Sequence, residues 1–206
     1  MCPGHIGRYL GLTGARLGPA DALYCGFATH FVPRERVPDL VSALAGLPWR
    51  DGAERAQTEE VLASFHSDPD LPPLAARRAA IDRCFAAETV EAILDALTRE
   101  AKASGPGGEW AAETRALLLT KSPTSLKVTL RQLIVGRDYD LEQALALEYR
   151  LTQHFMAGHD FYEGVRAVVV DKDQNPRWRP ATLAEVTDSA VTGYFAPLGD
   201  RKLTFS

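Results

Sequence analysis

Residues 27–32 form the one segment of this sequence with the aromatic and β-branched composition of a strand. Pro33 follows directly and stops it. A stable sheet needs further strands, because a lone strand leaves its backbone groups unpaired. Elsewhere the apolar residues recur at helical spacing. The sequence therefore predicts a mainly α-helical chain in which residues 27–32 need strand partners that the sequence does not supply.

Capping residues mark the helices in the last third of the chain. Ser122 and Pro123 combine an N-cap with proline at the first helical position, and Gly136 is suited to end that helix. Asp140 and Gln143 have the spacing of a capping box, in which two side chains bind each other's backbone N–H groups. Two helices are therefore expected, one on each side of Gly136.

Asp160 and Glu163 repeat the spacing of a capping box, so we expect Asp160 to be the N-cap of a helix over residues 161–170. Thr89 is expected to cap an earlier helix. Apolar spacing predicts helices at residues 6–12, 19–23, 34–44, 54–65, 74–85, 90–97 and 110–120, with loops at 66–73 and 104–108.

Composition excludes several classes of protein. The net charge is -4 and the two signs are interspersed, so neither nucleic acid nor a membrane surface is expected as the main partner. No apolar run approaches the roughly 20 residues that span a bilayer. Cys2, Cys25 and Cys84 are odd in number and lack CxxC spacing, which argues against a disulfide framework or a zinc site and favours a reducing compartment.

No local motif predicts a catalytic or metal site. Residues 171–175 resemble the start of a calcium loop, but Pro176 and Thr182 stand where glycine and a bidentate glutamate are needed. The carboxylate pairs 59/60 and 88/91 are typical of a solvated surface. Metal-ligand spacing is also missing among the histidines, which are His5, His30, His66, His154 and His159.

Several segments nevertheless resemble a known family. TGARL at residues 13–17 and GFATHFV at 26–32 are similar to a late-core signature of the crotonase superfamily. The later segments resemble one family within it, the 3-hydroxyisobutyryl-CoA hydrolases, and so does the long helical stretch between residues 41 and 120, which enoyl-CoA hydratases typically lack. These later segments are SPTSLKVTLRQL at 122–133, EYRL at 148–151, HDFYEGVRA at 159–167, DKD at 171–173 and PRW at 176–178.

This resemblance implies a fold. The chain would be the C-terminal helical portion of the α/β crotonase fold, a ClpP-like spiral, with the core sheet largely missing. Residues 1–34 would form the last turn of the crotonase core, residues 35–120 a helical insertion, and residues 121–206 the C-terminal helical region.

The resemblance also implies an activity, the hydrolysis of a branched 3-hydroxyacyl-CoA thioester to the free acid and CoA in valine catabolism. The family's oxyanion-hole amides and its catalytic glutamate and aspartate are expected upstream of Met1, so no catalytic residue is assigned here. Lys172 is the candidate for contact with the CoA phosphates. No metal or redox cofactor is implied, because CoA is part of the substrate.

Two other functions stay open at this point. One is an enoyl-CoA hydratase or isomerase of the same superfamily, and the other is a non-catalytic helical interaction module. Expected partners are an acyl-CoA and either further copies of the chain or a missing N-terminal segment. The Ala- and Arg-rich composition favours a bacterial cytoplasm, with the mitochondrial matrix as the alternative.

Overall fold

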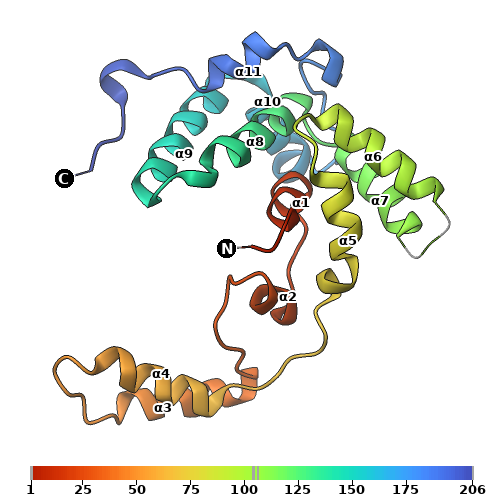
Figure 1. The fold of residues 1–206 in the computed structure, drawn as a ribbon. Helices are drawn as coiled ribbons and strands as arrows, with labels where there is room; N and C mark the ends of the chain where they lie inside the picture. Colours follow the sequence, from red (N-terminus) through yellow and green to blue (C-terminus); the bar gives the residue numbers. More distant parts are fainter. Residues whose placement is uncertain (1, 104, 106, 206) are drawn as a thin grey trace. The chain divides into compact units, whose positions relative to one another are not determined.

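A computed structural model describes residues 2–103, 105 and 107–205, and this part of the chain contains helices and no β-strand (Figure 1). The chain divides into two compact units, residues 1–6 with 16–79 and residues 7–15 with 80–206. One boundary falls within α1 (Ile6–Thr13), one just after it between residues 15 and 16, and one within α5 (Pro73–Phe85). Within the described ranges, every helix is too short or too polar to cross a membrane.

Residues 27–33 form an irregular connection, so the prediction of a strand there is wrong. The Phe31 N–H donates to Nδ1 of His66 at 3.1 Å, and the Ser67 N–H donates to the Phe31 carbonyl at 2.9 Å. Phe27 is 64% exposed. The segment has strand composition but no strand beside it, and a side chain and one backbone bond satisfy Phe31 instead.

The first unit contains a helical hairpin, which we define as residues 34–65. It comprises the 3₁₀ helix η1 (Arg34–Arg36), α3 (Val37–Ala45) and α4 (Glu54–Phe65), and it follows α2 (Pro19–Tyr24). Helices α3 and α4 pack against each other. Gln57 is the buried residue of α4, and it is held by Pro48 O and Arg50 N–H, whereas α3 buries none of its residues.

The second unit contains the chain's main apolar core. Its helices are α6 (Val90–Lys102), α7 (Gly108–Leu119), α8 (Pro123–Val135), η2 (Gly136–Asp138), α9 (Leu141–Met156), α10 (His159–Val165), the π-helix η3 (Arg166–Val170), η4 (Leu183–Glu185), α11 (Asp188–Tyr194) and η5 (Gly199–Arg201). Helix α6 packs along α7 and also against α8, while α11 packs on α8 and α9 (Figure 1).

The amphipathic pattern of α6 explains its place in this core. Val90, Ile93, Leu94 and Leu97 recur at helical spacing and are all buried. The hydroxyl of Thr89 accepts from the Ala92 N–H at 3.2 Å, which confirms the predicted N-cap.

A second cluster lies where α8, α9 and α11 meet. Its fully or nearly fully buried members are Val128, Leu147, Leu151, Val186 and Val191. The caps predicted for α8 and α9 are confirmed: Ser122 caps α8, and Asp140 and Gln143 form the capping box of α9.

The predicted N-cap of the next helix is wrong. Gly158 is the N-cap of α10, and Asp160 and Glu163 lie inside that helix, buried. Both side chains do bind backbone N–H groups, as in a capping box. Those groups belong to Arg177 and Arg179, which are distant in sequence, and not to the start of the helix. Periodicity also did not predict α11, whose cap is Thr187.

Candidate functional site

The segment that carries the family-like motifs folds into a polar network around Arg166, at the first residue of η3. Its guanidinium binds both carboxylate oxygens of Glu163 at 2.8 and 2.9 Å. A third nitrogen binds Asp171 at 2.6 Å and Asp173 at 2.7 Å. One forked cation therefore joins the end of α10 to the turn that follows η3, which is the kind of geometry that arginine provides.

Electrostatics keep this network ionised. Hydrogen bonds from Arg166, and then from the Arg177 N–H at 2.7 Å, lower the pKa of Glu163 to about 2. The same guanidinium lowers the pKa of Asp173, and the three carboxylates raise the pKa of Arg166. Glu163, Asp173 and Arg166 therefore carry their charges at neutral pH. The network is therefore suited to fixing a loop, and not to transferring protons.

Asp160 forms a second anchor beneath this loop. Its two oxygens accept from the Ser122 hydroxyl at 2.6 Å and from the Arg179 N–H at 2.8 Å. Trp178 donates its indole N–H to the Thr120 carbonyl at 2.9 Å. The Trp178 ring packs on α10 beside Gly164, where an added Cβ would lie 3.4 Å from the ring, at ordinary contact distance. Residues 177–179 are thus held against α10 and the start of α8.

Lys172, the candidate contact for CoA phosphates, lies in the turn that Arg166 holds. Its backbone adopts a left-handed φ of 58°, and Gln174 does so at 54°. The side chain of Lys172 is exposed, while its neighbours Asp171 and Asp173 bind Arg166. This turn therefore fixes the backbone from which an exposed ammonium group extends.

The acidic residues of the same turn are engaged by a cation. Both Asp171 and Asp173 bind Arg166, and Asp173 also accepts from the Asn175 N–H at 2.9 Å. Across residues 2–103, 105 and 107–205, no three His, Cys, Asp or Glu side chains are grouped so that they could hold a metal ion. The Asp-Lys-Asp sequence is accounted for by the structure of the loop.

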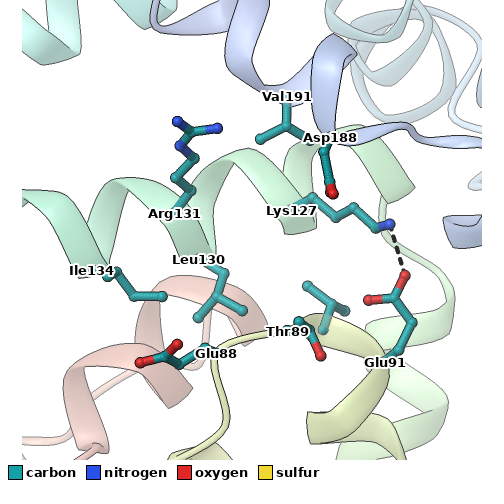
Figure 2. Close-up of a pocket in the computed structure, with 10 residues that line it drawn as sticks. Glu88, Thr89, Glu91, Lys127, Leu130, Arg131, Ile134, Asp188 and Val191 are labelled. Carbon is teal, nitrogen blue, oxygen red and sulfur yellow. Dashed lines mark ion pairs between the residues drawn. The ribbon is translucent and has the colours of Figure 1, made fainter.

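A groove of about 230 Å³ lies between the start of α6, one face of α8 and the start of α11. Figure 2 shows Lys127 reaching from α8 toward Glu91 of α6, and their charged atoms are 2.7 Å apart. Lys127 also donates to the Val186 carbonyl at 3.0 Å. Leu130 and Val191 are apolar residues of its lining. The groove has mixed polarity, and its lysine is already engaged.

Arg131, one helical turn after Lys127, holds the C-terminal residues. It donates to the Thr192 hydroxyl at 2.7 Å, and its guanidinium lies 4.9 Å from the centre of the Phe195 ring. On α9, Arg150 donates to the Phe195 carbonyl, and His154 lies 3.1 Å from the Ala196 carbonyl. We call these contacts the C-terminal clamp, because they attach residues 192–196 to α8 and α9.

Sequence reasoning found the segments of this site but not the roles within it. Glu91, expected on a solvated surface, pairs with Lys127, although it is 47% exposed. No sequence pattern indicated a role for Arg166. Acidic residues three positions before it and five and seven positions after it were the available signal, because a forked cation can gather carboxylates from both sides.

Comparison with known proteins identifies the family of this chain. The model of the family described as "Enoyl-CoA hydratase/isomerase" matches residues 1–195. The chain belongs to the enoyl-CoA hydratase/isomerase family. Among curated members, "3-hydroxyisobutyryl-CoA hydrolase, mitochondrial" of Rattus norvegicus is 42% identical over 98% of this chain, and "3-hydroxyisobutyryl-CoA hydrolase 1" of Arabidopsis thaliana is 43% identical over 94% of it.

Solved structures of the enoyl-CoA hydratase/isomerase family agree in fold. A carnitinyl-CoA dehydratase from Mycobacterium thermoresistibile superposes with a TM-score of 0.83 at 38% identity over 99% of this chain. An enoyl-CoA hydratase from Rhodobacter sphaeroides gives 0.81 at 39% identity. The 206 residues span about half of these relatives, namely 51% of the rat protein and 54% and 55% of the two solved chains.

Proposed function

We propose that these residues are part of a 3-hydroxyisobutyryl-CoA hydrolase, which cleaves a branched 3-hydroxyacyl-CoA thioester into the free acid and CoA. The observation that carries the proposal is the 42–43% identity to proteins of that name over nearly the whole chain. The sequence resemblance, read from the residues alone, supports the same activity.

We further propose that the groups that react with the thioester belong to sequence outside these 206 residues. The curated relatives are about twice as long as this chain. The acidic side chains of the Arg166 network are neutralised by a cation, so they are poorly suited to acid or base catalysis. The proposed hydrolysis needs no metal or redox group, and CoA enters as part of the substrate.

An exposed apolar surface supports the idea that the chain packs against the remainder of a crotonase fold. Val168, Val169 and Val170 of η3 are 55%, 62% and 68% exposed, and Phe161 and Tyr162 of α10 are also exposed. This concentration of exposed apolar side chains within residues 161–170 favours an interface patch here. We propose that the core sheet of the fold covers it.

Lys172 comes two residues after this patch, and we propose that its ammonium binds a CoA phosphate. Its exposure and positive charge support this role. The Arg166 network supports it as well, because a loop already fixed before binding loses less conformational freedom. The composition supports a bacterial cytoplasm as the compartment, whereas the animal relatives have "mitochondrial" in their names.

Activity is tested by following the release of the CoA thiol from 3-hydroxyisobutyryl-CoA. We expect no release above buffer by the 206-residue chain alone. Release should appear when the chain is combined with a polypeptide carrying the part of the rat relative that the match leaves out. Turnover by the chain alone would contradict the proposed location of the reacting groups.

The same mixture separates the hydrolase from a hydratase, the activity named for the Rhodobacter relative. Hydration of an enoyl-CoA consumes its double bond and releases no thiol. Loss of the enoyl absorbance with no thiol release from either substrate would replace the proposed function. For the phosphate contact, Lys172→Ala should weaken binding of CoA to the combined protein, whereas the exposed control Lys202→Ala should not.

A further inference from the structure

The helical hairpin of residues 34–65 is closed at its base by two hydrogen bonds. The Phe31 N–H donates to Nδ1 of His66 at 3.1 Å, and the Ser67 N–H donates to the Phe31 carbonyl at 2.9 Å. Phe31 lies just before the hairpin, and His66 and Ser67 lie just after it. We call these three residues the neck, because they join the two ends of a 34-residue excursion of the chain.

One of these two bonds depends on the protonation state of a histidine. Nδ1 of His66 accepts the Phe31 hydrogen bond in this geometry, which requires the tautomer with its proton on Nε2. A second proton would occupy Nδ1 and place two donors face to face. Histidine is the side chain that ordinarily changes charge between pH 5 and 8. A proton on Nδ1 would therefore remove the acceptor on which the neck relies.

The surroundings of His66 do not compensate for this loss. The His30 ring stands edge-on, 5.6 Å away between centroids, so two protonated rings would repel each other. Asp68 lies 3.6 Å from Nε2 of His66, and Glu59 of α4 lies 3.5 Å from Nε2 of His30, but both carboxylates are largely or fully exposed and screened by water. Arg36 of η1 adds positive charge over the neighbouring Phe65 ring.

We propose that the neck is a pH-sensitive latch, closed while His66 is neutral and opened when its imidazole gains a proton. Opening breaks the Phe31–His66 bond and leaves the hairpin attached through its two chain connections and the bond from Ser67. The helices of the hairpin keep their own hydrogen bonds, because α3 and α4 pack on each other and not through His66. The latch therefore releases the base of the hairpin without unfolding it.

Hydrogen exchange of the Phe31 amide in the full 206-residue chain tests this latch, read by NMR at pH 8 and pH 5 and corrected for intrinsic exchange. Protection of that amide should fall about tenfold at pH 5, since one hydrogen bond is lost, while amides within α4 keep theirs. His66→Asn places a non-titrating oxygen where Nδ1 lies, and it should hold protection constant across this range. His66→Ala should lower protection at both pH values.

The control variant is His154→Asn on α9, which should show the same pH response as the unmodified chain. Equal protection of the Phe31 amide at pH 8 and pH 5 in the unmodified chain would overturn the proposal. A pH response of the same size in His66→Asn would overturn it too, because the titrating group would then be another one. Equal protection in the unmodified chain would be decisive even if a variant fails to fold.

Discussion

Replacing Asp160 by alanine tests whether this residue is a buried anchor or a helix cap. In the structure its carboxylate accepts the Ser122 hydroxyl and the Arg179 N–H, and the residue is 9% exposed. Alanine removes both acceptors but leaves the two donors in place. Because the bonds join α10 to the start of α8 and to residues 177–179, the cost should appear in the stability of the whole second unit.

The magnitude follows from the number of donors left without a partner. The buried Ser122 hydroxyl costs ~1–3 kcal/mol when it loses its acceptor. The part-buried Arg179 N–H costs less, so Asp160→Ala should lower the free energy of unfolding by about 2–4 kcal/mol. Loss of a helix cap alone costs ~1 kcal/mol. Asparagine separates the two roles further. As a cap it equals aspartate, but as an anchor it turns an amide toward Ser122 and should cost about 1–2 kcal/mol.

Urea denaturation followed by circular dichroism measures these differences. The control is Asp200→Ala, an exposed position in the tail, where a change within about 0.5 kcal/mol is expected. A double-mutant cycle with Ser122→Ala should give a coupling of about 1–2 kcal/mol. An Asp160→Ala cost near 1 kcal/mol together with a neutral Asp160→Asn would refute the anchor and restore the cap.

Three further outcomes follow from packing and charge. Leu151→Ala should lower the free energy of unfolding by about 2–5 kcal/mol in urea denaturation, because Leu151 is buried among α8, α9 and α11. The exposed Leu145→Ala should change it by less than about 0.5 kcal/mol. Similar costs for both variants would contradict the assigned core. The folded pKa of Glu163, about 2, lies below its ordinary 4.5, so its stabilising effect is complete above pH 4.5 and is lost as the pH falls through 2; an NMR titration of its carboxyl midway near pH 4.5 would disprove the ion pair. Burial raises the pKa of the Cys84 thiol to about 11. At pH 8 a thiol reagent should therefore label the half-buried Cys2 well before Cys84 in the folded chain, as read by mass spectrometry. Equal labelling rates would contradict the burial of Cys84.

Local chemistry predicted the helices well, because their signals depend on nearby residues. Thr89, Ser122 and the pair Asp140 and Gln143 cap the helices that their sequence positions indicate. A cap needs only the backbone N–H two or three residues ahead, so a few adjacent residues are enough to predict it. The predicted extent of α4 at residues 54–65 also agrees with the structure.

Prediction failed where a residue's partner is distant in sequence. Asp160 has the spacing of a cap, but its actual partners, Ser122 and Arg179, lie 38 and 19 positions away. Residues 27–32 have strand composition, but a strand depends on neighbours that composition cannot show. The 104–108 linker stays a prediction, since positions 104 and 106 lie outside the described residues. The same holds for the predicted domain boundaries and for the role of Lys172.

The C-terminal clamp has a practical consequence for labelling this protein. The last carbonyl that it holds is that of Ala196, and most of residues 197–205 are exposed. A fluorophore or an affinity handle attached beyond Ala196 would therefore leave the contacts of Arg131, Arg150 and His154 intact. The same bulk inserted between residues 186 and 196 would separate α11 from α8 and α9, so the two positions provide a ready comparison for surface immobilisation.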